Sequence, residues 1–201
     1  MSGKVFDPAR IDRLETPERL AWLPPGEVAD RLRLHGGMTI ADIGAGSGYF
    51  SIPFARMVAP GGRVYAVDLQ PKMLEFLSAK LRRPDAPANI ETVEGSADRT
   101  GVPDGACDLV FLAEVWHEID DRAAVLREVT RILRPGGRLA ILDWRPDLEP
   151  PPGPPAHHRI AAADTAAELE ASGWRVSSNG PVGRFSYLAI ASLTTRSEAR
   201  P

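Results

Sequence analysis

The residues best suited to chemistry lie in a glycine-rich loop, Asp42-Ile43-Gly44-Ala45-Gly46-Ser47-Gly48-Tyr49. Three glycines at alternate positions let the backbone turn sharply and let a ligand come into contact with the main chain. The loop joins an apolar run to a helix predicted to begin near Tyr49, which is where doubly wound sheets bind nucleotide-like ligands. Because position 49 is tyrosine, the spacing departs from G-x-G-x-x-G, and no Gly-Lys-Ser/Thr follows, which excludes a phosphate-binding P-loop.

An acidic residue accompanies this loop. Asp68 ends the next apolar run, 24 residues after Gly44. A carboxylate at the end of the second strand of such a sheet can accept both hydroxyls of a ribose. The loop and Asp68 together predict a site for an adenosine-containing ligand.

A second group of polar residues follows the fourth apolar run, in the segment Ala113-Glu114-Val115-Trp116-His117. His117 is the candidate catalytic residue, because imidazole titrates near neutral pH and can act as a base or orient an acceptor. The alternative is a structural histidine bonded to a neighbouring loop. Trp116 is interpreted as a wall of the substrate pocket, or else as a packing residue. His117 and Asp120 alone do not make a metal site, so we expect no metal.

A third group lies beyond the fifth apolar run and is assigned to substrate recognition: Asp143, Arg145, His157 and His158. Chain topology should bring these side chains to the carboxyl edge of the sheet, where ligands bind. Such a set can recognise a carboxylate or a phosphate. The alternative is a set of solvated residues at a helix start.

The elements that must position these residues alternate between strand and helix. Apolar runs typical of buried strands cover residues 38–43, 63–68, 89–94, 107–112 and 138–143, followed by strands at 174–178 and 184–193. Amphipathic helices are predicted from Pro71, over about 121–134 with Asp120 as N-cap, and over about 161–172. A turn at Asn179-Gly180-Pro181 makes the last two strands antiparallel.

This pattern predicts an α/β fold, Rossmann-like and doubly wound. We expect a three-layer αβα arrangement around a mostly parallel seven-stranded sheet with one antiparallel strand. Thr16 should cap a short helix before this core, and Pro24-Pro25 should break it before a second helix over residues 26–34.

Five motifs in this order resemble class I S-adenosylmethionine-dependent methyltransferases, in the bacterial small-molecule branch that includes the ubiquinone/menaquinone-biosynthesis type. They are Asp42-Ile43-Gly44-Ala45-Gly46-Ser47-Gly48, Val67-Asp68-Leu69, Glu94-Gly95-Ser96-Ala97-Asp98, Asp108-Leu109-Val110-Phe111-Leu112 and Leu133-Arg134-Pro135-Gly136-Gly137-Arg138-Leu139. The resemblance covers about residues 38–193. It implies S-adenosylmethionine as cofactor, S-adenosylhomocysteine as product and in-line methyl transfer to an O, N or C atom of a small molecule.

The resemblance also implies roles for single residues. Asp42 would receive the cofactor's ammonium, although it could instead only cap the following turn. Asp68 would hold the ribose, Leu69 would pack against the adenine, and Asp98 would accept from the adenine amino group unless it is a surface acid. The remaining expected cofactor residues are Gly44, Ala45, Gly46, Gly48, Tyr49, Ala97, Ala113 and Glu114.

The resemblance divides the chain into three parts. Residues 1–37 form an N-terminal helical extension that would fold over the cofactor as a lid, with Phe6 and Trp22 as apolar contacts. Residues 38–193 form the cofactor-binding domain, and residues 194–201 form a tail.

Composition narrows the function further. With a net charge of −3 over 201 residues and no Asn/Asp-Pro-Pro-aromatic segment after the fourth strand, no nucleic-acid partner is expected. The single cysteine, Cys107, disfavours thiol-dependent arsenite methylation. No apolar run approaches the roughly 18–20 residues needed to span a bilayer, and residues 1–10 lack the apolar core of a signal peptide, so we expect a cytoplasmic protein without a membrane span. A catalytically silent cofactor-binding sensor or scaffold, an NAD-type oxidoreductase, and the choice between monomer and homodimer stay open.

Overall fold

A seven-stranded sheet forms the centre of the computed structural model, which describes residues 6–14, 16–148 and 153–194. The strands are β1 (Thr39–Ile43), β2 (Arg63–Asp68), β3 (Ile90–Glu94), β4 (Cys107–Ala113), β5 (Leu133–Trp144), β6 (Trp174–Val182) and β7 (Ser186–Leu193). Their spatial order is β3-β2-β1-β4-β5-β7-β6. β1 to β5 pair in parallel, whereas β7 runs antiparallel to both β5 and β6. The predicted doubly wound fold with one antiparallel strand is confirmed.

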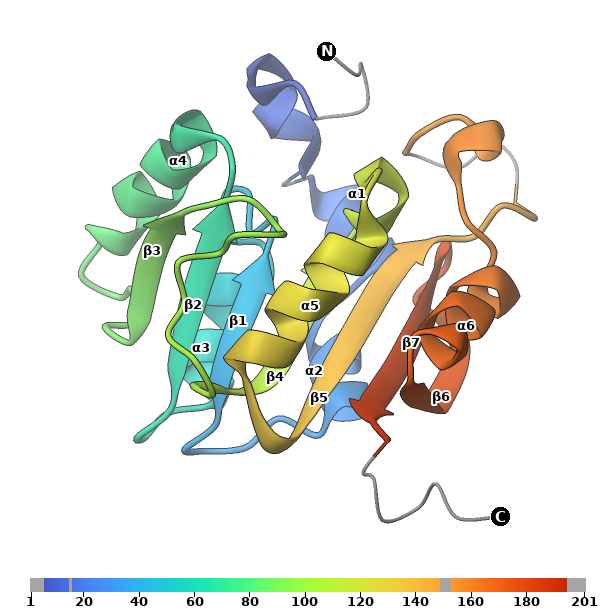
Figure 1. Cartoon of the computed structure of the whole chain (residues 1–201). Helices are drawn as coiled ribbons and strands as arrows, with labels where there is room; N and C mark the ends of the chain where they lie inside the picture. The colour runs from blue at the N-terminus through green and yellow to red at the C-terminus, as the bar shows by residue number, and fades with distance from the viewer. Residues whose placement is uncertain (1–5, 15, 149–152, 195–201) are drawn as a thin grey trace.

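Helices cover both faces of the sheet (Figure 1), and those predicted from Pro71, over about 121–134 and over about 161–172 are present, although the second ends at Ile132 because β5 begins at Leu133. They are α1 (Pro17–Trp22), α2 (Pro25–Leu32), α3 (Ser51–Met57), α4 (Pro71–Leu81), α5 (Arg122–Ile132) and α6 (Ala162–Ala171), with 3₁₀ turns η1 (Pro8–Leu14), η2 (Trp116–Glu118) and η3 (Ala156–His158). One core joins Val110 and Leu112 of β4 to α5 and α6. Another joins Leu109 and Phe111 to α2 and α3. Successive side chains of a strand point to opposite faces, so both faces of β4 are buried.

The strand order reverses between β1 and β4, because β2 lies on one side of β1 and β4 on the other. The segment after β1 therefore leads to α3 on one face of the sheet and the segment after β4 to α5 on the other, and the carboxyl edge between them is where such sheets bind ligands. In Figure 1 the N-terminal helical turns, drawn in blue, lie above this edge. The fold thus brings the glycine loop, the segment after β4 and the N-terminal segment together.

The predicted turn at Asn179-Gly180-Pro181 is wrong. β6 continues to Val182, and the chain reverses over residues 183–185, where Gly183 has a φ of 57°. Proline lacks an amide hydrogen, but β6 is the edge strand, so Pro181 can pair with Tyr187 of β7 without breaking a ladder on its other side.

The predicted N-cap of α5 is also wrong by one residue. Asp121, not Asp120, accepts a hydrogen bond from the amide of Ala124 at 2.9 Å, because α5 begins at Arg122 and a capping side chain must reach the third helical residue. The predicted cap Thr16 is confirmed, since its hydroxyl accepts from the amide of Arg19 at 3.2 Å.

The N-terminal helices pack into the body of the domain. Leu23, Val28 and Leu32 have no exposed surface and share a core with Ile40 and Phe54. Residues 149–152 of the predicted proline linker and residues 195–201 of the predicted tail lie outside the described residues. In the described part of the chain no helix has both the length and the apolarity needed to span a bilayer.

Candidate active site

The glycine loop adopts a conformation that requires its glycines. Gly44, Gly46 and Gly48 have φ values of 76°, 56° and 86°, a region that residues with a Cβ rarely adopt. A Cβ on Gly44 would lie 2.3 Å from Cγ2 of Val115, and one on Gly48 would lie 2.5 Å from Cδ1 of Leu77. The loop therefore packs directly against the segment after β4 and against α4.

Most amides of this loop already have partners. The amides of Gly44 and Ala45 both donate to the carbonyl of Val67, and the amide of Gly48 donates to the carbonyl of Ala45. The amide of Gly46 donates to Oδ2 of Asp68 at 2.8 Å. These four N–H groups hold the loop in shape, so they are not free to bind a carboxylate ligand.

Asp68 ends β2 with 7% of its surface exposed. Its Oδ2 accepts from Gly46 and its Oδ1 accepts from the amide of Gln70 at 2.9 Å. Burial raises the pKa of Asp68, although the two backbone hydrogen bonds oppose the rise. A carboxylate has about four lone-pair sites, so each oxygen retains capacity for a hydroxyl donor. Next to it, Leu69 exposes 58% of its surface, which offers an apolar platform for a flat ring.

Asp42 lies beneath the loop and is 2% exposed. Ser51, the first residue of α3, donates from its hydroxyl to Oδ2 of Asp42 at 2.5 Å. Burial raises the pKa of Asp42 from 3.8 to about 7, while the Ser51 hydrogen bond opposes this rise and the charge of Asp68 adds to it. Sequence reasoning missed Ser51, because an isolated serine in a helical first turn carries no signal of its own.

His117 and Asp143 form a buried dyad. Nδ1 of His117 lies 2.8 Å from Oδ1 of Asp143, whose Oδ2 accepts from the backbone amide of His117 at 2.9 Å. The amide of Trp144 also donates to Oδ1. The Asp143 carboxylate therefore fixes the ring and favours the tautomer with the proton on Nδ1, leaving Nε2 as the acceptor. Burial lowers the pKa of His117, but the hydrogen bond and charge of Asp143 outweigh it, so the net pKa is raised.

Two residues predicted to touch substrate lie too deep to do so. Asp143 has no exposed surface, so it acts through His117 and not on a ligand directly. Trp116 also has no exposed surface and belongs to the core beneath α5, where Arg122 lies 5.5 Å from its ring. The expectation that Trp116 walls the pocket is wrong, and the packing alternative holds.

Glu118 follows His117 and was missed as a site residue. Its Oε1 lies 3.9 Å from Nε2 of His117, and 20% of its side chain is exposed. The pKa of Glu118 is raised to about 7, mainly by burial. The charge of His117 opposes this rise, and the charges of Asp143 and Asp68 add to it. Glu118 therefore lies in the same electrostatic environment as both the dyad and the predicted ribose carboxylate.

The N-terminal segment crosses the site from the end of β2 to the end of β4. The carbonyl of Phe6 accepts from Nε2 of Gln70 at 3.0 Å. A Cβ on Gly46 would lie 3.9 Å from Cδ1 of Leu14. Trp22, predicted as an apolar contact to the cofactor, instead packs against the rings of Trp144 and Phe185, at 5.4 and 5.6 Å between ring centroids.

Arg19 of α1 enters the site as an unpredicted residue. Its Nη2 lies 2.7 Å from Oε2 of Glu114, its Nη1 donates to the carbonyl of Leu14, and its guanidinium carbon lies 4.1 Å from the centre of the Tyr49 ring. Ala113, just before Glu114, is half-buried at the end of β4. No local pattern distinguishes Arg19 from the many other arginines, because its partner lies 95 residues away.

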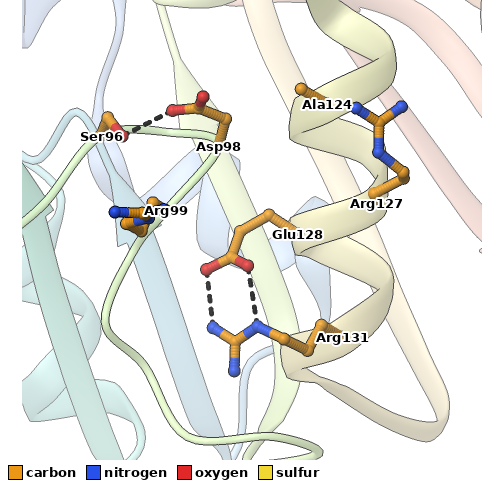
Figure 2. Close-up of a pocket in the computed structure, with 7 residues that line it drawn as sticks. All are labelled: Ser96, Asp98, Arg99, Ala124, Arg127, Glu128 and Arg131. Carbon is orange, nitrogen blue, oxygen red and sulfur yellow. Dashed lines mark hydrogen bonds and ion pairs between the residues drawn. The ribbon is translucent and has the colours of Figure 1, made fainter.

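Asp98 lines an open cleft of about 590 Å³ between the β3–β4 connection and α5 (Figure 2). Ser96 donates to its Oδ1 at 2.5 Å, and Asp98 itself is exposed. Ala97 packs against the core. Across the cleft, Figure 2 shows the ion pair between Glu128 and Arg131, so these two side chains already neutralise each other.

The third predicted cluster lies beyond β5, and the structure joins only part of it. Arg145 pairs with Asp147 at 2.6 Å. The rings of His157 and His158 in η3 are 4.3 Å apart. Arg159 ties the two segments together, donating to the carbonyls of Pro154 and Arg145. In the described segments of the chain, no three potential ligands gather as a metal site would require.

Comparison with known proteins agrees with this geometry. A family model for the methyltransferase domain matches residues 41–141. The ubiquinone/menaquinone biosynthesis C-methyltransferase UbiE of Enterobacter sp. (strain 638) is 34% identical over 115 residues, which cover 57% of this chain and 46% of that protein. UbiE of Hahella chejuensis is 33% identical over 121 residues, covering 60% and 49%. The chain therefore spans about half the length of the curated relatives it matches.

Solved structures extend the likeness to nearly the whole chain. A SAM dependent methyltransferase from Aquifex aeolicus superposes with a TM-score of 0.87 and 31% identity, over 93% of this chain and 98% of that one. A putative type 11 methyltransferase from Sulfolobus solfataricus, at 22% identity and a TM-score of 0.71 over 89% and 97%, shares the fold. With the strand order, the glycine loop and the family model in agreement, this chain belongs to the S-adenosylmethionine-dependent methyltransferase family of class I.

Proposed function

We propose that this protein transfers a methyl group from S-adenosylmethionine to an O, N or C atom of a small molecule. The observation that carries the proposal is the hydrogen bond from the amide of Gly46 to Asp68, which fixes the glycine loop beside this carboxylate where the strand order reverses between β1 and β4. The loop leaves no room for side chains at Gly44 and Gly48, and Asp68 keeps lone pairs for ribose hydroxyls. When bound, the cofactor supplies a methyl group already activated on a sulfonium.

The cofactor residues follow from this arrangement. Asp68 would accept from the ribose hydroxyls, Leu69 would pack against the adenine, and Ala97 and Asp98 would approach the adenine edge. Asp42 beneath the loop would offer a negative charge to the ammonium end. A positive group nearby favours the ionised carboxylate and so offsets the burial that raises the pKa of Asp42.

His117 would act on the acceptor. Holding a nucleophile at about 3–3.5 Å from the methyl carbon supplies much of the acceleration in such a displacement. Where the acceptor atom carries a proton, Nε2 of His117 would accept it, because Asp143 holds Nδ1 and stabilises the resulting imidazolium. Asp143 is a positioning residue in this scheme, and the raised pKa of His117 is the expected consequence of its charge.

The acceptor would enter from the side of the β4 and β5 ends. Arg145, His157 and His158 stay the candidates for recognising an acidic group on it, with Arg159 as their anchor. The curated relatives are named as C-methyltransferases of ubiquinone and menaquinone biosynthesis, but they extend well beyond the matched segment. The proposal therefore includes O, N and C acceptors alike. It also places the protein in the cytoplasm.

Calorimetry with S-adenosylhomocysteine tests the proposal. Wild-type protein should bind it, and Asp68→Ala should weaken binding at least tenfold, the loss of about one charge-assisted hydrogen bond. Asp85→Ala is the matched control, since 81% of the Asp85 side chain is exposed. Binding of NADH without binding of S-adenosylhomocysteine would overturn the proposal.

Screening metabolite extracts with methyl-labelled S-adenosylmethionine then separates an enzyme from a silent binder. An enzyme transfers label to an acceptor, and His117→Gln slows that transfer. Binding without transfer to any extract component would favour a sensor or scaffold.

A further inference from the structure

Arg19 and Glu114 form a buried ion pair that stability alone does not explain. Their side chains are 7% and 10% exposed, and the pair joins α1 to the end of β4. Each side chain also keeps one buried atom without a hydrogen-bond partner, Nε of Arg19 and Oε1 of Glu114. A buried polar atom left unpaired costs about 1–3 kcal/mol, so two of them in one pair make this pair a candidate for binding a ligand.

The backbone at Glu114 is strained in the same place. Glu114 has a φ of 61°, a conformation uncommon for residues other than glycine, and its amide donates to the carbonyl of Leu142 at 2.7 Å. Such strain persists where the surrounding structure holds it, typically at ligand sites. Burial raises the pKa of Glu114, although the charge of Arg19 opposes the rise.

The pair faces the end of the site opposite Asp68. Asp68 ends β2 on one side of β1, whereas Glu114 follows β4 on the other side, and Arg19 lies over the Tyr49 ring that ends the glycine loop. With the ribose on Asp68, the amino-acid end of the cofactor falls toward the β4 side. That end carries one carboxylate and one ammonium.

The amides of Gly44, Ala45, Gly46 and Gly48 are already bonded within the protein, so these four groups do not serve this carboxylate. We propose that Arg19 binds the α-carboxylate of S-adenosylmethionine through its Nε edge, and that Glu114 orients Arg19 while its free Oε1 receives the α-ammonium. A guanidinium offers a planar fork that matches a carboxylate, and a charge-assisted bond is about twice as strong as a neutral one. The inference rests on the proposed function.

The orphan atoms are shielded from water, so the N-terminal segment must shift for the ligand to reach them. Among the described residues, the hydrogen bonds that would have to adjust include those of Nη1 of Arg19 to Leu14, of the Tyr49 hydroxyl to the carbonyl of Leu23 at 2.7 Å, and of Nε2 of Gln70 to Phe6. Arg19 thus couples the position of α1 to the presence of the amino-acid end.

Two ligands that differ only at this end test the assignment. S-adenosylhomocysteine carries the α-amino-acid group, and 5′-methylthioadenosine lacks it. We expect Arg19→Met to weaken binding of S-adenosylhomocysteine about 30-fold, as for one charge-assisted contact, and to change that of 5′-methylthioadenosine less than threefold. Glu114→Gln should likewise weaken binding of S-adenosylhomocysteine more than binding of 5′-methylthioadenosine. Arg10→Met, at an exposed position of η1, is the matched control and should change neither affinity.

A third ligand separates the two charges. Decarboxylated S-adenosylmethionine keeps the ammonium, so Arg19→Met should leave its affinity within threefold of wild type, whereas Glu114→Gln should weaken it. If Arg19→Met does not fold, as judged by circular dichroism, Arg19→Lys keeps the charge without the fork and should still lose at least fivefold for S-adenosylhomocysteine alone.

The outcomes are distinguishable. Equal weakening of S-adenosylhomocysteine and 5′-methylthioadenosine, or no weakening of either, would show that Arg19 is only structural and would overturn this inference while leaving the proposed function intact. Wild-type protein that binds neither ligand would instead overturn the proposed function.

Discussion

Replacing Asp42 by asparagine should stabilise the fold while weakening the cofactor site. Asp42 is 2% exposed; the hydroxyl of Ser51 donates to it, and the like charge of Asp68 lies nearby. Within the described residues no cation offsets its burial, so burial dominates and its pKa rises from 3.8 to about 7. Asparagine has the same shape and still accepts the Ser51 hydroxyl through its amide oxygen.

The magnitude and sign follow from proton linkage. One pKa unit corresponds to about 1.4 kcal/mol, so a rise from 3.8 to about 7 makes the ionised carboxylate cost the fold up to about 4 kcal/mol. Because the folded state holds the proton more tightly than the unfolded state, stability falls as pH rises from about 4 to about 7 and stays reduced above that. Asparagine does not ionise, so the stability of Asp42→Asn should not fall over this pH range. We expect it to exceed wild type at pH 8 by about 2–4 kcal/mol and to match it near pH 4.

Urea unfolding followed by tryptophan fluorescence between pH 4 and pH 8 measures this difference directly. Asp85→Asn, at an exposed position, controls for the loss of one negative charge. In the same preparations, Asp42→Asn should bind S-adenosylhomocysteine at least tenfold more weakly, because the ammonium loses one of the two carboxylates, Asp42 and Glu114, proposed to face it. A variant no more stable than wild type at pH 8, or one with an unchanged pH slope, would refute the burial argument. A stabilised variant with unchanged affinity would remove Asp42 from the cofactor site.

Three further predictions concern other parts of the chain. In single-turnover kinetics with an acceptor that carries a proton, His117→Gln should lower the methylation rate about 100-fold or more. Asp143→Asn should also lower this rate while its affinity for S-adenosylhomocysteine stays within threefold of wild type, and the wild-type rate should rise with pH through the raised pKa of His117. Glu128→Gln should destabilise the fold by about 2 kcal/mol at pH 7, as measured by urea unfolding. Arg131 lowers the pKa of Glu128 to about 2, so the stability that the Glu128 carboxylate contributes in wild type should be present above pH 4.5 and lost as pH falls toward 2. Gly44→Ala should abolish detectable S-adenosylhomocysteine binding in calorimetry, since its Cβ would lie 2.3 Å from a Val115 methyl group at a φ of 76°; unchanged affinity would mean that the loop is more adaptable than its contacts indicate.

Local patterns were enough for the strands and the loop between them. The central strands β1, β2 and β4 are short apolar runs buried on both faces, and such runs carry their own signal. The three glycines with positive φ and the acid that ends β2 also act within a few residues of their own position. Where a competing rule applied, as at Pro181, local reasoning failed, because the position of β6 at the edge of the sheet is a property of the whole fold.

Backbone preference and apolar periodicity are properties of consecutive residues, so the doubly wound fold, the glycine loop, the acid at the end of β2 and the family resemblance could be predicted from sequence. Contacts between distant segments could not: Asp143 lies under His117, Trp116 belongs to the core, Ser51 donates to Asp42, and Arg19 pairs with Glu114. The physical reason is that burial and side-chain pairing depend on which residues of distant segments become neighbours. Arg19 and Glu114 are 95 positions apart, and nothing local to either residue marks the other as its partner.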